Sequence, residues 1–345
     1  QGFQFKMTKT DGSAIPPKTS SKNFSFTRSH IMDFGVIDDT VPTEKVLYTT
    51  VSGAGTKDGS SWTNAFDVAA LRAALVSGEE LGNVTIKMAG GTYVLNNDSE
   101  KFLSLAHESK DVRIEGGYNP SDGTRNVASQ QTILSGDKKY TIIGIFGANS
   151  KFTFDGLTFK DCTQVSTDGN TCVGVISVGL QKSIVVNINN CRFEDNIMTS
   201  AANGAVIYAS TANINVTNCV FANNKGKEKG SCTYATGANC FFYMYNCVFY
   251  GNSITGNHGS NLYQDCNWGM HKCTIYSTLE GTDKNHNVIY ATGNYIISSC
   301  QIFGNTNCNS AMGVFRADPT HLGSGLIVDT EIMAMHPSKG DGFIH

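Results

Sequence analysis

The phrase Asn190-Cys191-Arg192-Phe193 recurs as Asn218-Cys219-Val220-Phe221 and as Asn246-Cys247-Val248-Phe249. Looser copies follow at Cys273-Thr274-Ile275-Tyr276 and Cys300-Gln301-Ile302-Phe303, so the five cysteines are separated by 28, 28, 26 and 27 residues. Successive side chains of a strand point to opposite faces, which places the cysteine and the aromatic residue of each phrase on one face. We expect that face to point inward, with cysteine as a small apolar packing residue.

A second column of aromatic residues lies half a period away. Its phrases are Val206-Ile207-Tyr208, Cys232-Thr233-Tyr234, Asn261-Leu262-Tyr263, Val288-Ile289-Tyr290 and Gly313-Val314-Phe315, with steps of 26, 29, 27 and 25 residues between the aromatics. A shared period of about 27 residues, made of short strands between Gly and Asn turns, is too short for propeller blades and lacks the helix of leucine-rich repeats. The two columns predict an all-β fold, a right-handed parallel β-helix or solenoid.

Stacked coils place like residues on like residues, about 4.8 Å apart. Asparagine suits the ends of such strands, because it tolerates left-handed backbone and its amide can bond along the stack. Asn196, Asn224 and Asn252 each follow an aromatic residue by three positions, and Asn305 follows Phe303 by two. We expect them to form a ladder.

The first coil needs a cover over its open end. Apolar Phe66, Ala70, Ala73 and Ala74 recur at helical spacing after a Thr63/Asn64 cap signal, which predicts an amphipathic capping helix. We therefore assign residues 45–345 to the β-helix domain. Residues 1–44 form an N-terminal extension, which is either the tail of a preceding domain or a segment laid along the main one.

Composition excludes several classes of protein. The chain has 345 residues, 40% of them hydrophobic, and a net charge of −3, which argues against a nucleic-acid partner. No run of 18 apolar residues exists, so no transmembrane segment is expected, and a chain that opens at Gln1 is expected to be processed or truncated. We expect a monomer.

Eleven cysteines cannot all pair within one chain, and none has the C-x-x-C spacing of a zinc or redox site. No metal and no cofactor is expected. Stacked parallel side chains seldom meet the dihedral angle of a disulfide, so the cysteine column is expected to hold free thiols. Cys232 and Cys240 flank a short Gly-containing segment and are the expected bonded pair.

Several phrases resemble known β-helix proteins. Those of the N-terminal coils resemble bacterial secreted proteins of the pectin-lyase-like superfamily, and the later coils resemble repeats of the polymorphic outer-membrane protein family. The first resemblance is carried by residues 52–66, 90–93, 114–118 and 132–137. The second is carried by residues 203–207 and by the Phe-x-x-Asn phrases. The resemblance covers about residues 45–345 and implies a secreted or cell-surface protein, at the bacterial outer membrane with or without a lipid anchor. That superfamily holds lyases, hydrolases and adhesins, so the fold does not choose among them.

The second column predicts a candidate binding stripe. If Ile207, Leu262, Ile289 and Val314 point inward, the aromatic residue after each must point outward, and sugar rings pack on such stripes. The stripe would contain Tyr208, Tyr234, Tyr263, Tyr290 and Phe315, flanked by Gln264, Asp265 and Arg316. The alternative exchanges the faces, or buries the tyrosines as a stack beneath a loop.

The leading hypothesis is a non-catalytic adhesion or glycan-binding protein whose partner is a polysaccharide, or a host or cell-surface glycan or protein. The alternative is a polysaccharide lyase or glycoside hydrolase acting on an acidic polysaccharide. A lyase needs a base and a cation, yet Arg192 and Arg316 belong to different columns. A hydrolase needs a carboxyl pair, and Asp265 and Asp318, the nearest candidates, lie two coils apart. A purely structural stalk is a third possibility.

Overall fold

The computed structural model describes residues 45–334, except for 77–82, 95–102, 107, 139–142, 165–173, 180–182, 199–205, 228, 255–260, 277–287, 305–314 and 318–323. The predicted extension, Asn305, Val314, Asp318 and the side chain of Arg316 lie outside the described residues. The chain divides into two units between Glu44 and Lys45.

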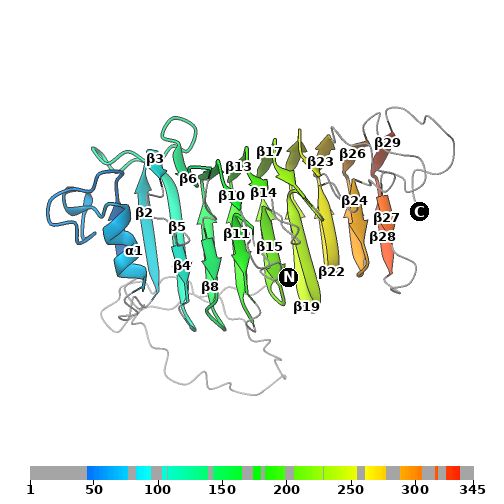
Figure 1. Ribbon diagram of the computed structural model, residues 1–345, viewed down its shortest axis with the longest axis horizontal. Coiled ribbons are helices and arrows are strands. Elements are labelled where there is room, and N and C mark those ends of the chain that lie inside the picture. Colours follow the sequence, from blue (N-terminus) through cyan, green and yellow to red (C-terminus); the bar gives the residue numbers. More distant parts are fainter. Residues whose placement is uncertain are drawn as a thin grey trace, which may run out of the picture. The chain divides into compact units, whose positions relative to one another are not determined.

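The described residues form a parallel β-helix, as the repeat predicts: every pairing between named strands is parallel and joins one coil to the next (Figure 1). The first face contains β1 (Lys45–Thr49), β2 (Val84–Ala89), β5 (Asp111–Tyr118), β8 (Lys151–Asp155), β12 (Val185–Asn189), β16 (Asn213–Thr217), the second halves of β19 (Thr233–Tyr245) and β22 (Leu262–His271), β25 (Tyr295–Ser298) and β28 (Gly325–Val328).

Three further faces contribute strands, the third of them in only four of the described coils. The second face contains β3 (Gly91–Val94), β6 (Thr132–Ser135), β9 (Leu157–Lys160), β13 (Arg192–Glu194), β17 (Val220–Ala222), β20 (Val248–Tyr250), β23 (Thr274–Tyr276), β26 (Gln301–Gly304) and β29 (Glu331–Ala334). The third contains β10 (Thr163–Gln164), β14 (Ile197–Met198), β18 (Lys225–Gly226) and β21 (Ser253–Ile254). The fourth contains β4 (Leu103–Leu105), β7 (Ile143–Ile145), β11 (Ile176–Val178), β15 (Ile207–Ser210), the first halves of β19 and β22, β24 (Ile289–Ala291) and β27 (Phe315–Ala317).

The predicted inward face is confirmed for the first three phrases, whereas in the last two Ile275 and Ile302 are buried in place of the aromatic residue and Tyr276 is 49% exposed. Phe159, Phe193, Phe221 and Phe249 stack in the core with ring centroids 4.6–4.9 Å apart. The five cysteines of the column are buried and free, and each thiol donates to the backbone carbonyl two residues before it. In-register stacking therefore builds the core from columns of apolar residues, with runs of one residue type among the phenylalanines and the cysteines.

The predicted disulfide is wrong: Cys232 and Cys240 are both free and buried. Cys232 directly precedes the fourth-face half of β19, whereas Cys240 directly precedes the first-face pairing that starts at Phe241. The extended segment between the two cysteines holds their Cα atoms too far apart for an S–S bond.

The asparagine ladder is confirmed for its described members. Asn196, Asn224 and Asn252 are fully buried. The Asn224 Nδ2 donates to Asn252 Oδ1 at 3.0 Å and to the Phe193 carbonyl at 3.0 Å, while its Oδ1 accepts from Asn196 Nδ2 at 2.8 Å. The side-chain amide of Asn224 is thus hydrogen-bonded both to the coil before it and to the coil after it.

The capping helix is confirmed as α1 (Val68–Val76), preceded by the 3-10 turn η1 (Trp62–Asn64), and it lies beside β2 at the N-terminal end of the stack (Figure 1). Its buried face differs from the expected one, because Leu71 and Leu75 enter the core while Ala73 is exposed. The cap also differs, since Asp67 Oδ1 accepts the backbone N–H of Ala70 at 2.8 Å.

Candidate functional site

The predicted tyrosine stripe is a buried stack. Tyr208, Tyr234, Tyr263 and Tyr290 form a cluster apart from the main core, so they do point out of the coil interior, yet each is only 6–8% exposed. Neighbouring rings stack with centroids 4.8–5.5 Å apart, and Lys229 Nζ lies 4.7 Å from the Tyr263 centroid. The tyrosine rings are not exposed as expected, because each ring face is covered by the ring on the neighbouring coil. A binding role for these tyrosines stays a prediction.

Phe315 does not continue that stripe. It pairs in register with Ile289, while Arg316 pairs with Tyr290. Phe315 is fully buried in the main core, with its ring centroid 5.0 Å from that of Tyr295. The expected outward position is wrong because this coil is shifted by one residue, which moves a side chain to the opposite face.

The two described flanking residues are engaged within the fold. Gln264 is fully buried, and its Nε2 donates to Thr233 Oγ1 at 2.6 Å. Asp265 accepts hydrogen bonds from the hydroxyls of Thr236 and Thr292, one on each neighbouring coil. These contacts tie coils together.

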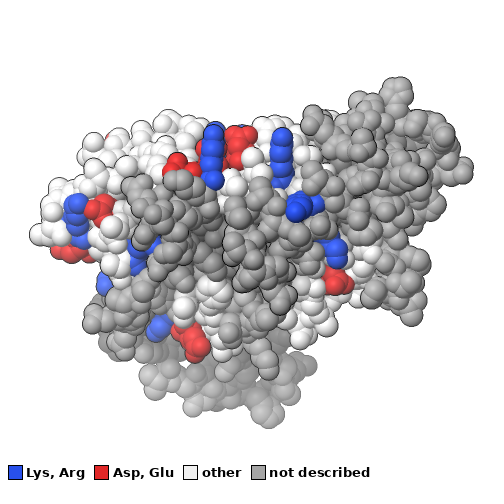
Figure 2. Space-filling view, viewed as in Figure 1, with Lys and Arg blue, Asp and Glu red and all other residues white. Residues whose placement is uncertain are grey.

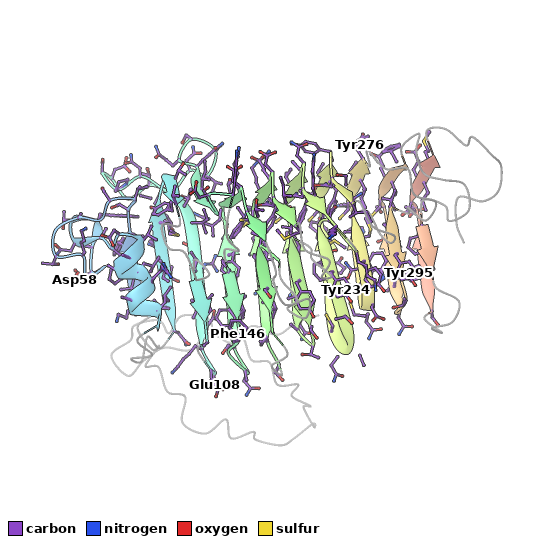
Figure 3. The ribbon with its side chains drawn as sticks, in the orientation of Figure 1. Asp58, Glu108, Phe146, Tyr234, Tyr276 and Tyr295 are labelled. Carbon is purple, nitrogen blue, oxygen red and sulfur yellow. The ribbon has the colours of Figure 1, made fainter. Side chains whose placement is uncertain are left out.

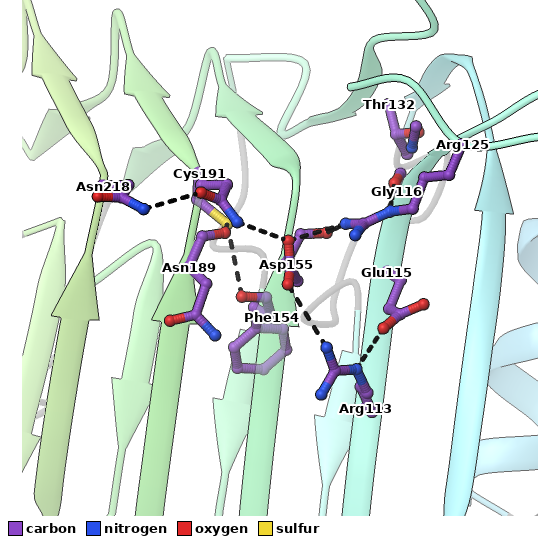
Figure 4. A network of polar contacts seen from close by, with 12 residues as sticks. Arg113, Glu115, Gly116, Arg125, Thr132, Phe154, Asp155, Asn189, Cys191 and Asn218 are labelled. Atoms are coloured by element: carbon purple, nitrogen blue, oxygen red, sulfur yellow. Dashed lines mark hydrogen bonds and ion pairs between the residues drawn. The ribbon is translucent and has the colours of Figure 1, made fainter. Parts of the chain in front are cut away.

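The outward side of the first face changes character along the stack. Its N-terminal coils carry a charged network centred on Asp155, which accepts from Arg125 Nη2 at 2.8 Å, from Arg113 Nη2 at 3.5 Å and from Asn190 Nδ2 at 3.1 Å (Figure 4). Glu115 completes it, as an acceptor from the Arg113 guanidinium. On the side of the molecule seen in Figure 2, opposite charges lie beside one another, not in a patch of one sign.

Glu115 of this network does not suit general acid–base catalysis. Burial acts to raise the pKa of Glu115, but the hydrogen bonds from Tyr118 and Arg113 outweigh it and lower that pKa. Asp155 is held by two guanidinium groups. A poised acid or base would need a pKa shifted toward neutrality. Sequence reasoning missed this network, because its bonded partners are up to 42 residues apart and follow no motif.

The C-terminal coils of the first face carry an open groove of about 700 Å³. It is built from the strand halves of β19 and β22 on this face, with β25 and β28. The lining residues are Phe241, Phe242, Tyr243, Asn267, Trp268, Gly269, Met270, Asn294, Tyr295, Ile296, Ser298, Ser324, Gly325 and Leu326. Four of them are large apolar residues with high exposure: Phe241 52%, Tyr243 44%, Ile296 57% and Leu326 54%.

Tyr243 forms an aromatic platform in this groove. A Cβ on Gly269 would lie 3.1 Å from Tyr243 Cδ2 and 3.3 Å from Cε2, so the ring extends over the glycine of the next coil. The ring therefore lies across a bare stretch of backbone instead of standing in a stacked column. An accessible aromatic face of this kind is what the C–H face of a sugar packs against.

Polar groups are present beside the platform. Asn294 Nδ2 donates to Asn267 Oδ1 at 2.9 Å, and Asn294 Oδ1 accepts the N–H of Ser324 at 2.8 Å. The side chain of Trp268 lies on the other side of the sheet, where it pairs in register with buried Phe242 and packs in the main core against Tyr295.

The groove is electrically neutral. None of its described lining residues is charged, and burial raises the pKa of both Tyr243 and Tyr295 above its ordinary value. Both phenols are therefore uncharged across the physiological range. In the described ranges, no group of His, Cys, Asp and Glu could hold a metal ion, and no described helix has the length and apolar character to cross a membrane.

The fold and the groove define a parallel β-helix protein with a neutral, aromatic-lined surface groove. Comparison with solved structures finds similarity to one described as "Crystal structure of pectate lyase Pel9A", at 12% sequence identity and a TM-score of 0.40, covering 88% of this chain and 80% of that chain. No family model matches the sequence, and no curated protein matches it. At this identity the likeness says nothing about a reaction.

Proposed function

We propose that this protein is a secreted or cell-surface β-helix protein that binds glycan chains without cleaving them, in an adhesive role. The observation that carries the proposal is the Tyr243 platform within the first-face groove. An open groove lined by accessible aromatic faces and amides suits a chain of sugar rings lying along the coils.

The catalytic alternative has less support. Glu115 and Asp155, the buried carboxylates described above, are held in ion pairs and lie in the N-terminal coils, away from the groove. Arg192, a candidate cation for a lyase, is paired with Glu194 on its own strand. The described surface therefore supports glycan binding better than it supports hydrolysis or elimination.

The test exposes the protein to neutral and uronic-acid polysaccharides, and measures bound protein and released reducing or unsaturated ends together. We expect retention without product, and at least about tenfold weaker binding by Tyr243→Ala. The matched control is Tyr276→Ala on the second face, because Tyr276 is 49% exposed but stacks on Phe303 (Figure 3).

Three outcomes contradict this proposal. Product release would make the protein an enzyme and direct attention to the network around Asp155. Equal losses in the two tyrosine variants would remove the groove from the binding site. Absence of retention on every polysaccharide would favour a protein partner or a structural stalk.

A further inference from the structure

An apolar row runs from coil to coil along the outward side of the groove. It consists of Tyr243, Gly269, Ile296 and Leu326, which pair in register on four successive coils. Because the Tyr243 ring lies over Gly269, the row presents an aromatic face followed by two aliphatic side chains, each more than half exposed. We call this row the apolar floor of the groove. Apart from the Tyr243 hydroxyl, its side chains offer no hydrogen-bond partner to a ligand.

Polar side chains flank the apolar floor on both sides in the coils of β22 and β25. Alternate residues of a strand share a face and lie about 7 Å apart, so each polar side chain stands two positions from a residue of the floor. One edge is formed by Asn267 and Asn294, and the other by His271 and Ser298. Ser298 Oγ and His271 Nδ1 share a hydrogen bond of 2.8 Å. Asn267 Oδ1 accepts from Asn294 Nδ2, while no acceptor is found for the Asn267 Nδ2 among the described residues.

A sugar ring whose hydroxyl groups are all equatorial fits this arrangement. Its faces present only C–H groups, while its hydroxyl groups point outward around the ring edge, where each can donate and accept. An axial hydroxyl group would point into the apolar floor, where it would leave water without finding a partner. An axial linkage would turn the next ring away from the floor. None of the described lining residues is charged, so a ring carboxylate would find no cation among them.

We propose that the first-face groove binds a flat, β-1,4-linked glycan of all-equatorial hexoses, of which a glucose chain is the simplest. The chain runs from coil to coil along the apolar floor. A C–H face stacks on the Tyr243 ring and the next ring lies on Ile296, with hydroxyl edges at Asn267 and Ser298. This inference rests on the proposed function, since it assumes that the groove binds sugar.

Two oligomers that differ at one carbon atom of each ring test the axial position. Cellohexaose and β-1,4-mannohexaose are both flat chains of six hexoses, but each mannose carries an axial hydroxyl group at C2. Titration calorimetry of the full-length protein is expected to give a Kd for cellohexaose at least about tenfold below that for mannohexaose. Maltohexaose, whose glucose residues have axial linkages, is expected to bind as weakly as mannohexaose.

A variant of the floor tests where the selection is made. Ile296→Thr places a hydroxyl group in the floor and keeps a β-branched side chain, so the preference for cellohexaose is expected to fall below about threefold. The matched control is Val248→Thr, because Val248 is 36% exposed on the second face, and it should leave both affinities unchanged. Circular dichroism checks that each variant is folded. If Ile296→Thr is not, Leu326→Thr replaces it, with the same expected result.

The outcomes separate this inference from the proposed function. Equal affinity for cellohexaose and mannohexaose, or the same narrowing of preference in Ile296→Thr and Val248→Thr, overturns the equatorial selection and leaves glycan binding intact. Tighter binding of maltohexaose or of oligogalacturonate overturns the flat neutral ligand. If no oligomer binds while a polysaccharide still retains the protein, this inference fails alone. If neither oligomers nor polysaccharides bind, both proposals fail together.

Discussion

The ring of Tyr243 occupies the space that a side chain on Gly269 would need, with Tyr243 Cδ2 3.1 Å from the position of a Cβ. The two residues are paired in register on neighbouring coils. The missing side chain of one residue thus exposes the aromatic face of the other.

Gly269→Val is expected to displace the Tyr243 ring and weaken glycan binding about tenfold, since the loss of one stacking contact is worth about 1.4 kcal/mol or less. Gly269→Ala should have a smaller effect in the same direction. The control is Asn187→Val, which changes the same outward row two coils before Tyr243. Unchanged affinity in Gly269→Val would show that the platform takes no part in binding.

Asn224→Ala is expected to lower the free energy of unfolding by about 2–5 kcal/mol, because it leaves Asn196 Nδ2 and the Phe193 carbonyl buried without this partner. Urea unfolding measures the change. Asn215→Ala is the matched control, because the exposed Asn215 Nδ2 donates to Asn187 Oδ1 on the neighbouring coil, and it should cost less than about 1 kcal/mol. Similar losses in both variants would contradict the special role of burial.

Arg125→Ala is expected to cost about 1.5–3 kcal/mol of unfolding free energy. Arg125 Nη2 pairs with Asp155 Oδ1, and its Nε donates to the Gly116 carbonyl at 2.8 Å, so the change removes a charge-assisted contact between coils. Lys151→Ala serves as the control, since its pair with Asp111 is exposed and such pairs contribute about 0–1 kcal/mol. Thermal unfolding that shows the same shift for both would refute this ranking.

Glu115 should make the protein less stable in acid. Its pKa is lowered in the fold from an ordinary value of 4.5, so its contribution is present above that value and is lost as pH falls through the folded-state pKa. We expect Glu115→Gln to flatten the decline of unfolding free energy below about pH 4.5. Urea midpoints from pH 2 to 7 test this, and a decline as steep as that of the parent protein would assign the acid sensitivity elsewhere.

Native thiols should resist modification. The nine described cysteines, out of eleven in the chain, are buried and free, and burial raises the pKa of Cys162 and of Cys232. Titration with an aromatic disulfide reagent is therefore expected to modify no more than Cys172 and Cys308 before unfolding, and all eleven in guanidinium. Rapid reaction of more than two thiols in the native protein would contradict the buried column.

Part of the groove could have been found from the sequence. Tyr243 and Gly269 are 26 residues apart, the same step that separates Cys247 from Cys273, so the repeat already places the glycine above the tyrosine. The tyrosine column attracted attention because it was regular. Regularity in a stacked fold indicates rings that cover one another, and the accessible ring is the one whose neighbour breaks the pattern.

The amino-acid sequence alone determined the period, the inward cysteine and phenylalanine columns, the asparagine ladder and the capping helix. These follow from sequence because parallel in-register stacking puts each residue on its equivalent one coil away. The tertiary structure alone decided the one-residue shift at Phe315, the contacts of Arg125 with Asp155, and the groove. Those features depend on strand register at coil corners and on where outward side chains lean, which the repeat leaves unconstrained.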